Sequence, residues 1–433
     1  MLFGKDAPRE NIVVRGARVL DPGAAVDAVL DVRIDDGVIA ALGSGLDTNS
    51  HRVIEGDGLL LAPAFVDPHV HLRTPGREDE ESIASGTAAA AAGGYCAILA
   101  MPNTDPVVDS SATLGSLVDA ARAEAAIPVG FLAAITKGQS GAELTEMAEL
   151  ADAGAAGFTD DGVPVCSAGL MRRALQYGAV TGRRIALHCE EPTLSRGGHM
   201  HEGAVSAELG FTGYPSVAES VMVERDLSLA AFERRPLHLL HLSAWESVQA
   251  LRRARAEGVQ ATAEVTPHHL CLTDEAVRSL DPNVKMNPPL RSASDRTALI
   301  EGLKDGTITA IATDHAPHAR HEKDVPFEAA PFGVTGLETA FAALYTHLVE
   351  PGLVPLETVL ERMSAGAARA YGLDEPRVAV GAQANLVLLD LHAAYTVSED
   401  LFRSRSVNSW LLGETVKGKV RATIAAGRLA YSS

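Results

Sequence analysis

Several histidines and aspartates in this sequence have spacings that suit the binding of a metal ion. His69 and His71 are two residues apart in FVDPHVHL, so their side chains would point the same way from a strand. Asp160 and Asp161 are adjacent in GFTDDGVP. Further candidates are His188 in LHCE, His241 in LLHLS and Asp314 in IATDHAPH. Imidazoles and carboxylates without thiolates suit Zn²⁺, with Mn²⁺ or Co²⁺ as alternatives.

Each of these candidates also has an ordinary structural explanation. Asp-Gly is a common turn dipeptide, so Asp160 and Asp161 could belong to a solvated turn. A lone His188 or His241 is more often a core histidine whose hydrogen bonds are satisfied, and Asp314 could cap a turn. The metal-binding interpretation therefore depends on whether the fold brings these side chains together.

The middle of the chain alternates short apolar runs with Ala/Leu/Glu/Arg segments of helical period. Strands that alternate with helices indicate a parallel sheet, and eight such units predict a (β/α)8 TIM-type barrel. Segments such as ESIASGTAAAAAGG and TALIEGLKDG are typical of the helices, and both end in glycine. The eight predicted strands lie within residues 65–72, 96–103, 128–135, 155–161, 184–190, 237–243, 259–269 and 308–315.

The polar candidates fall at the carboxyl ends of five of these runs. In a barrel those ends converge on one mouth, where the active site lies. Buried imidazoles and carboxylates at that mouth need partners, and a metal supplies them. Chance does not readily place so many such residues at equivalent ends of five strands. We therefore expect a metal centre at the mouth. The residues concerned are His69, His71, Asp160 or Asp161, His188, His241 and Asp314.

The two ends of the chain have β character. NIVVRGARVL and AVLDVRIDDGVIAALG alternate apolar and polar residues near the start, and ANLVLLDL and KVRATIAAGRLAYS do so near the end. A lone terminal hairpin would be marginally stable, so we expect the two ends to join in one small β-sandwich. The predicted organisation is residues 1–60 and 377–433 in the sandwich and 61–376 in the barrel.

Composition excludes several classes of protein. A formal net charge of −19 over 433 residues argues against a nucleic-acid partner, which would need a basic stripe. No stretch approaches the ~18 apolar residues of a membrane helix, and the N-terminus lacks a secretory pattern, so we expect a cytoplasmic protein without a membrane partner. The four cysteines are far apart, which favours reduced thiols: Cys96, Cys166, Cys189 and Cys271.

The motifs FVDPHVHLR, MPNT, FTDDG, LHCE, LLHLS, EVTPHHL, KMNPPLR and IATDHAPH together resemble the amidohydrolase superfamily. Within it, the chain is most similar to the bacterial class I dihydroorotases, from about residue 10 to the C-terminus. The resemblance implies a zinc enzyme that interconverts N-carbamoyl-L-aspartate and (S)-dihydroorotate, a reversible cyclisation in de novo pyrimidine (UMP) biosynthesis.

The resemblance also implies a ligand set for two zinc ions per subunit, bridged by Asp161 and a hydroxide. Many amidohydrolases bridge the metals with a carboxylated lysine on strand four, but this strand offers only Asp160 and Asp161. Lys137 follows strand three, and we interpret it as a surface or loop residue. We expect Asp160 to hydrogen-bond neighbouring backbone and Asp314 to act as the general base. The first zinc would take His69, His71, Asp161 and Asp314, and the second Asp161, His188 and His241.

An anionic substrate needs local cations in so acidic a protein, and Arg73 can hold a carboxylate with two hydrogen bonds. The family glutamate after this arginine is replaced here by Thr74, which bears on how Arg73 is oriented. The segment 318–333, which follows strand eight, is expected to be a flexible lid over the mouth. The substrate contacts implied by the resemblance are His71, Arg73, Asn103, Asn287, His318, Phe332 and Gly333.

Two alternatives accompany the dihydroorotase interpretation. A hydantoinase, dihydropyrimidinase or allantoinase would share the barrel and the ligand set, but its substrate lacks an α-carboxylate in the same position. A catalytically idle homologue that serves aspartate transcarbamoylase would be expected to lose ligands, and all six are present. The expected partners are a small anionic substrate and further copies of the chain, with possible association with aspartate transcarbamoylase.

Overall fold

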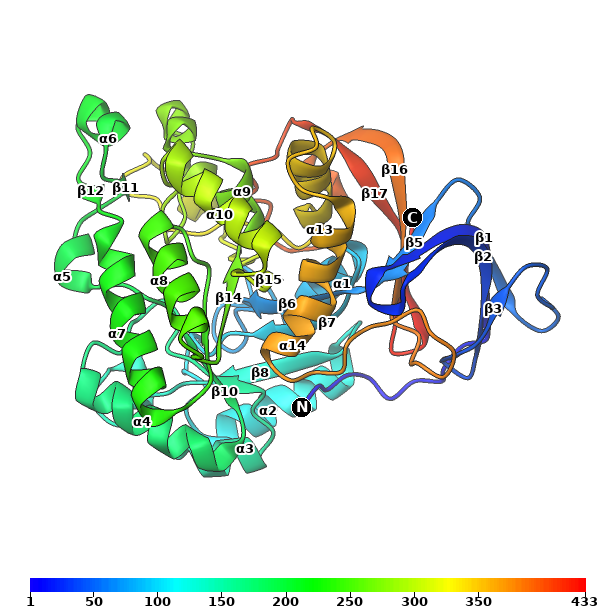
Figure 1. The fold of residues 1–433 in the computed structure, drawn as a ribbon, viewed down its shortest axis with the longest axis horizontal. Helices are drawn as coiled ribbons and strands as arrows, with labels where there is room; N and C mark the ends of the chain where they lie inside the picture. The colour runs from blue at the N-terminus through cyan, green and yellow to red at the C-terminus, as the bar shows by residue number, and fades with distance from the viewer.

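The computed structural model describes residues 1–433, and eight parallel strands form its centre (Figure 1). They follow one another around the barrel in chain order, and a parallel bridge between Val70 and His315 joins the last strand to the first. Seven strands fall within a predicted run and β7 begins one residue before its run, so the predicted barrel is confirmed. The strands are β6 Phe65–Val70, β7 Tyr95–Ala100, β8 Val129–Ala133, β9 Gly157–Phe158, β10 Arg184–Leu187, β13 Leu237–Leu239, β14 Ala261–Val265 and β15 Ala310–Ile311.

Helices surround the barrel and cover its outer face (Figure 1). Their main apolar core is a cluster of 75 buried residues shared with the strands. The longer helices are α1 Ile83–Ala92, α2 Ser111–Glu124, α4 Ala168–Thr181, α7 Val217–Glu233, α8 Trp245–Ala256, α10 Ala293–Asp305 and α13 Leu356–Met363. The shorter ones are α3 Met147–Asp152, α5 Pro192–Ser195, α6 Ala204–Leu209, α9 Pro267–Cys271, α11 Arg320–Lys323, α12 Ala340–Leu344 and α14 Ala365–Ala370. No helix of the protein is both long and apolar enough to cross a membrane.

Local signals in the sequence set where these helices begin and end. The Ser82 side chain accepts a hydrogen bond from the backbone N–H of Ser85, which caps α1, and the helix ends at Gly93. Ser292 caps α10 in the same way, and Gly306 ends it with a φ of 83°. Both predicted helices are therefore present with glycine at the predicted ends.

The terminal segments form one continuous sheet at the side of the barrel (Figure 1). The order is β18-β17-β16-β5-β1-β2-β3, with β4 also paired to β1. A bridge between Val38 and Gln383 brings the far edge back toward β16, and 14 buried residues form a separate core. The strands are β1 Ile12–Asp21, β2 Val26–Asp35, β3 Val38–Gly43, β4 Arg52–Glu55, β5 Leu60–Pro63, β16 Leu386–Thr396, β17 Thr415–Ala425 and β18 Arg428–Ser432.

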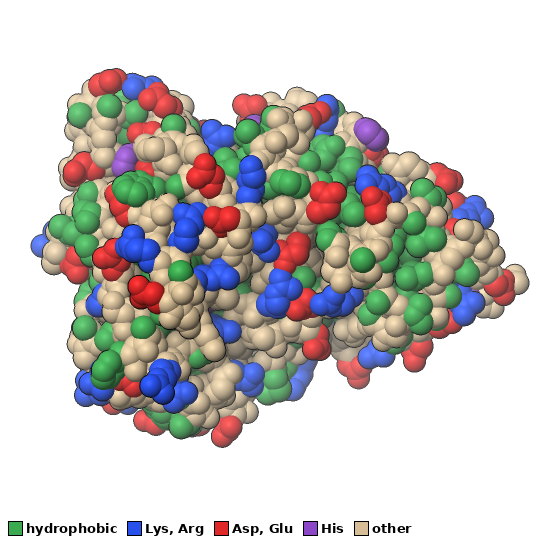
Figure 2. Space-filling view, in the orientation of Figure 1, with side chains coloured by type: hydrophobic (Ala, Val, Ile, Leu, Met, Phe, Trp, Pro, Cys, Tyr) green, Lys and Arg blue, Asp and Glu red, His purple; other side chains and the backbone are tan.

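The two ends of the chain thus join as predicted, and β5 pairs with β16 where the sheet meets the barrel. We propose that the chain is organised as residues 1–60 and 377–433 around residues 61–376. Acidic and basic side chains are interspersed on the face shown in Figure 2, without a stripe of one sign.

The inside of the barrel is a packed core and not a pore. Alternate residues of the strands point inward, among them Leu99 of β7, Leu132 of β8 and Ala186 of β10, and they pack with Leu240 and Tyr371. This apolar filling leaves the carboxyl ends of the strands as the place where polar side chains gather.

Candidate metal centre and active site

The six predicted metal ligands converge at the carboxyl ends of the barrel strands. His69 lies on β6, and the other five lie in the one to three residues that follow β6, β9, β10, β13 and β15. All six are buried, with exposed fractions of 7% or less: His69, His71, Asp161, His188, His241 and Asp314. Five strands that are far apart in the sequence therefore supply one cluster.

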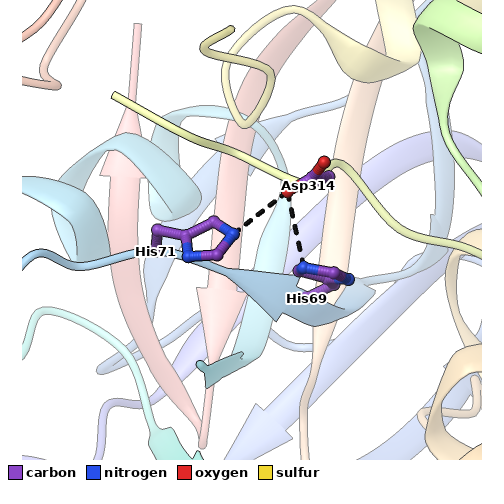
Figure 3. Close-up of side chains that lie close together, drawn as sticks. All are labelled: His69, His71 and Asp314. Carbon is purple, nitrogen blue, oxygen red and sulfur yellow. Dashed lines mark hydrogen bonds and ion pairs between the residues drawn. The ribbon is translucent and has the colours of Figure 1, made fainter. Parts of the chain in front are cut away.

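Four of these side chains present atoms at the spacing of ligands around one ion. Asp314 Oδ1 lies 3.4 Å from His69 Nε2 and 3.1 Å from His71 Nε2 (Figure 3). Asp161 Oδ2 lies 3.6 Å and 3.5 Å from the same two nitrogens. Nitrogen and oxygen ligands about 2.1 Å from a tetrahedral zinc ion are about 3.4 Å from one another. Each carboxylate oxygen thus stands at ligand spacing from both imidazole nitrogens.

A second group shares the other oxygen of the same aspartate. Asp161 Oδ1 lies 3.5 Å from His241 Nε2 and 3.9 Å from His188 Nδ1. The two imidazole nitrogens are 3.0 Å apart. Asp161 therefore turns one oxygen toward each group, which is how a carboxylate bridges two metal ions.

The electrostatics of the cluster favour a cation at its centre. His69 Nε2 and Asp161 Oδ1 are buried without a hydrogen-bond partner, which is costly unless an ion supplies the contact. Burial opposes a charged imidazole, yet the Asp161 and Asp314 carboxylates raise the pKa of His69 well above its usual value. Burial likewise opposes a charged carboxylate, but His69 holds the pKa of Asp161 well below its usual value. The residues present fit a bound metal.

The backbone is strained at three of the positions that face this cluster. His241, Asp314 and Arg73 have φ values of 27°, 48° and 56°, in the left-handed region that non-glycine residues avoid. Strain of this kind gathers at functional sites because the surrounding structure must impose it. Here it turns the side chains into the mouth of the barrel.

Asp160 and Asp161 have different roles in the structure. Asp160 accepts hydrogen bonds from the backbone N–H groups of Ile135, at 2.7 Å, and Thr136, at 3.1 Å, and from the Thr136 hydroxyl. These bonds tie the end of β9 to the end of β8. Asp161 then faces the histidines, and Gly162, with a φ of 76°, turns the chain away.

Further side chains orient the candidate ligands. His71 Nδ1 lies 2.9 Å from Asn103 Oδ1, and His188 Nε2 lies 2.8 Å from Glu190 Oε2. His69 Nδ1 lies 2.7 Å from Glu264 Oε1. A partner on one ring nitrogen sets which nitrogen faces the metal. Each ring is therefore held with its free nitrogen toward the cluster.

Sequence reasoning missed two of these positioning residues, Glu264 and Glu190. Glu264, in the middle of β14, is fully buried, and its second oxygen lies 2.9 Å from His238 Nε2. Glu190 belongs to the LHCE motif, but no role was predicted for it. A lone glutamate in an otherwise apolar strand such as ATAEV is a usable signal, because a buried carboxylate requires a partner.

The cluster opens into a cavity of about 170 Å³. Six of the seven predicted substrate contacts line it, and His318 is the exception. The lining residues are His71, Arg73, Asn103, Asp161, Gly162, His188, His241, Asn287, Asp314, Ala316, Phe332 and Gly333. The metal ligands and the predicted substrate contacts therefore share one space.

Arg73 is the cation that this cavity offers to an anion. Its Nε donates to the carbonyl of Pro317 at 3.1 Å and lies 3.0 Å from Glu80 Oε2. Burial lowers the pKa of Arg73 to about 10, so the side chain remains charged at neutral pH. Glu80, itself fully buried, supplies the carboxylate that orients Arg73 despite the threonine at position 74.

His318 is not among the residues that line this cavity. Its Nε2 is 2.8 Å from the carbonyl oxygen of Phe332, and its Nδ1 is 3.4 Å from Glu322. Asn287, by contrast, reaches the cavity. It donates to Glu190 at 3.0 Å, and its Oδ1 is buried without a partner, so it offers an acceptor to a ligand.

The segment 318–333, expected as a flexible lid, is folded against the mouth. It contains α11, and Phe332 and Gly333 form part of the cavity wall. The Lys323 ammonium donates to the carbonyls of Pro282, at 3.0 Å, and Pro331, at 2.8 Å. Lys285 holds the same segment through the carbonyls of residues 327 and 328. In this structure the segment is a tethered flap.

Lys137, which was interpreted as a surface or loop residue, is exposed and lies 2.5 Å from Glu143 in an ion pair. His315 bonds to Glu81 at 3.1 Å, and His269 bonds to Thr266 at 2.7 Å. These two histidines therefore make hydrogen bonds beside the cluster and are not among its candidate metal ligands.

Comparison with known proteins agrees with this geometry. Residues 58–247 match the family model described as dihydro-orotase-like. The chain is 46% identical to a dihydroorotase from Pelotomaculum thermopropionicum, over 96% of this chain and 98% of that protein. It is 44% identical to a dihydroorotase from Geobacter metallireducens, over 97% of this chain and 99% of that protein.

Solved structures show the same fold. An L-hydantoinase (dihydropyrimidinase) from Arthrobacter aurescens superposes with a TM-score of 0.87 and 25% identity, over 97% of this chain and 96% of that one. A dihydropyrimidinase from Brevibacillus agri gives a TM-score of 0.83 with 22% identity, over 97% and 94% of the two chains, and supports the fold alone.

The barrel and its histidine–aspartate cluster define an enzyme of the amidohydrolase class, one that hydrolyses cyclic amides. Within that class, identities of 42–46% to eight dihydroorotases over nearly the whole chain place this protein more narrowly. The chain belongs to the dihydroorotase family.

Proposed function

We propose that this protein is a zinc-dependent dihydroorotase that interconverts N-carbamoyl-L-aspartate and (S)-dihydroorotate in pyrimidine (UMP) biosynthesis. The observation that carries the proposal is the shared cavity, in which the bridging geometry of Asp161 stands beside the charged side chain of Arg73. A ring amide and a carboxylate on one small substrate would engage both features at once.

Two zinc ions per subunit would occupy the two groups of ligands. His69, His71, Asp161 and Asp314 would hold the first, and Asp161, His188 and His241 the second. When bound, such ions act as Lewis acids that polarise the amide carbonyl and lower the pKa of a water. The Glu264, Asn103 and Glu190 contacts would keep the three supported imidazoles aimed at them.

Asp314 is placed to move the proton. Its carboxylate stands at the cavity and beside His71, so it can accept a proton from the attacking water. It would then deliver that proton to the ring nitrogen as the amide C–N bond breaks. In the direction of ring closure, Asp314 would take the proton from the ureido nitrogen as the new C–N bond forms.

The remaining lining residues would bind the substrate. Arg73 would hold the α-carboxylate, with Asn103 beside it. Asn287 Oδ1, which has no partner, would accept from a ring N–H, and the backbone of Phe332 and Gly333 would line the ring. His318, whose Nε2 lies 2.8 Å from the carbonyl oxygen of Phe332, would join Arg73 and Asn103 at the carboxylate.

A hydantoinase, dihydropyrimidinase or allantoinase remains the second candidate, and the fold of the Arthrobacter aurescens enzyme favours it. The buried Arg73–Glu80 arrangement argues for dihydroorotate, because those other substrates lack the α-carboxylate. An idle partner of aspartate transcarbamoylase is disfavoured, since all six predicted ligands converge.

We further propose that the protein works in the cytoplasm as a homo-oligomer, with possible association with aspartate transcarbamoylase. Exposed apolar side chains on the neighbouring helices α7 and α8 support self-association. They are Val217 and Val221 of α7 and Trp245 of α8, which are 44%, 40% and 47% exposed. Sedimentation of the purified protein, alone and with the transcarbamoylase, tests this assembly.

The activity itself is tested by assaying the zinc-loaded protein on dihydroorotate, hydantoin, dihydrouracil and allantoin side by side. The expected result is turnover of dihydroorotate with a kcat/KM well above that of the other three. Preference for an uncharged ring would replace the proposal with the second candidate.

A further inference from the structure

A second cavity lies at the opposite end of the barrel from the metal ligands. We call it the basal cavity, and its volume of about 280 Å³ exceeds the 170 Å³ at the metal cluster. Arg184 is the first residue of β10, whereas His188 directly follows the last, so the two cavities lie at opposite ends of this strand. The basal cavity is lined by Leu175, Gly178, Ala179, Gly182, Arg183, Arg184, Ile185, Arg235, Pro236, Tyr371 and Gly372.

Three of these residues are arginines, and no carboxylate lines the cavity. In a protein with 56 acidic and 37 basic residues, a cationic cavity without an acidic residue is unexpected. None of the three arginines is among the ion pairs of the structure, although many other arginines are. The nearby carboxylate of Glu233 is engaged by Arg172 at 2.5 Å and Gln176 at 3.0 Å.

The arginine side chains have few other partners. Arg184 Nε donates to the carbonyl of Ala370 at 2.8 Å, which anchors the side chain and leaves the two terminal nitrogens free. Arg183 Nε is buried and has no hydrogen-bond partner. Burial lowers the pKa of Arg184, since no counter-ion compensates for the lost solvent.

A structural role does not explain this arrangement. The amino-terminal face of such a barrel usually serves stability, but three like charges around one cavity repel one another and cost stability. An anion in the cavity would remove that repulsion and satisfy the buried N–H. The feature is therefore better explained by a ligand than by packing.

The chemistry of the walls indicates what kind of anion fits. Guanidinium groups present a planar fork that binds phosphate oxygens with two parallel hydrogen bonds, and three of them suit a dianion better than a single carboxylate. Leu175, Ile185 and the ring of Tyr371 add apolar walls, which would accommodate a small organic body attached to the phosphate.

We propose that the basal cavity, through Arg183, Arg184 and Arg235, binds a phosphate dianion, either free or carried on a small organic molecule. This site is separate from the proposed catalytic cavity, and its occupancy does not depend on which cyclic amide the enzyme hydrolyses.

Titration calorimetry with inorganic phosphate and with ribose 5-phosphate tests the site in the full-length metal-loaded protein. Both probes should bind, and tighter binding of ribose 5-phosphate would identify an organic phosphate as the ligand. Tighter binding of inorganic phosphate would identify the free ion. The substitutions Arg184→Gln and Arg183→Gln should each weaken binding at least about tenfold, the effect of losing one charge-assisted hydrogen bond.

The matched control is Arg173→Gln, which removes the same charge from an exposed arginine of α4 that does not line the cavity. It should leave both affinities unchanged. The proposal is overturned if neither probe binds, if Arg173→Gln weakens binding as much as Arg184→Gln, or if binding persists unchanged in the Arg183→Gln/Arg184→Gln double variant. The last result would place the phosphate elsewhere, for example at Arg73.

Discussion

At the scale of single residues, Asp161 connects the two halves of the candidate site. Each of its oxygens faces a different pair of histidines, at distances between 3.5 and 3.9 Å. Its neighbour Asp160 faces the other way and holds the backbone at the end of β8. Removal of each of these two adjacent carboxylates should therefore have a different effect on metal binding.

The substitution Asp161→Ala should remove the second zinc ion and nearly all activity, because His188 and His241 alone would leave that ion two protein ligands. Asp160→Ala should keep both metal ions and retain far more activity. It should instead destabilise the fold by about 1–3 kcal/mol, since it leaves buried backbone N–H groups unpaired. Titrating zinc into both variants while following turnover and unfolding separates the two effects. Loss of metal from Asp160→Ala alone would contradict the assignment of the bridge.

The substitution Arg73→Met should weaken transition-state binding of dihydroorotate by about 3 kcal/mol or more, the scale of truncating one partner of a buried charge pair. Metal content should not change. Arg77→Met is the control, because Arg77 also contacts Glu80 but does not line the cavity. Steady-state kinetics with dihydroorotate measures this effect. A near-normal kcat/KM for Arg73→Met would show that Arg73 does not bind the substrate carboxylate.

Residue types, spacing and the family resemblance together indicated the six side chains that the fold brings together at the mouth. His69 and His71 sit two apart on a strand, and Asp161 precedes a glycine that turns the chain. Glu264 and Glu190 were not predicted as positioning residues. Glu264, for example, contacts His69, which is 195 positions away in the sequence. His318 stays a predicted substrate contact, and in this structure its Nε2 lies 2.8 Å from the carbonyl oxygen of Phe332.

At the scale of elements, the ends of the strands and the flap over them define the mouth. The eight strands were predictable from apolar runs and from glycines at helix ends. The conformation of 318–333 was not, because polar, proline-containing segments carry no periodicity. The flap is fixed by Lys285 and Lys323, whose ammonium groups donate to backbone carbonyls.

The flap should make the stability of the protein depend on pH. Burial lowers the pKa of Lys323 to about 7, well below the value of about 10.4 in an unfolded chain. Between these values the unfolded state binds more protons, so this lysine's contribution to stability rises with pH, by at most about 1.4 kcal/mol per unit. Below pH 7 both states are protonated and the contribution is constant.

Urea unfolding of wild type and Lys323→Met from pH 7 to 9 measures this effect. The free energy of unfolding of wild type should increase relative to that of the variant as the pH rises. Lys304→Met, which alters an exposed lysine of α10, should show no such trend. If the difference in the free energy of unfolding between wild type and Lys323→Met stays constant over this range, the lowered pKa of Lys323 is contradicted.

At the scale of the whole molecule, the fold separates stability from chemistry. Apolar side chains fill the inside of the barrel and the space under the helices, while the buried histidines and aspartates of the candidate metal centre gather at the mouth. The terminal sheet closes one side through its own core. Because the buried imidazoles and carboxylates at the mouth compensate one another only in part, bound metal should contribute to the stability of the whole fold.

Removal of metal by a chelator should therefore abolish turnover of dihydroorotate and lower the unfolding temperature, since a ligand that binds only the folded state stabilises it. Zn²⁺ or Co²⁺ should restore both properties, whereas Mg²⁺, which prefers oxygen ligands, should not. Full activity and an unchanged unfolding temperature in exhaustively metal-free protein would show that the cluster is not a metal site.

The most direct test of the two-metal site is anomalous diffraction at the zinc edge from crystals of the zinc-loaded protein. The predicted result is two anomalous peaks about 3.5–4 Å apart, with Asp161 between them. His69, His71 and Asp314 should surround one peak, and His188 and His241 the other. A single peak, or peaks that Asp161 does not join, would contradict the central claim that this aspartate bridges two zinc ions.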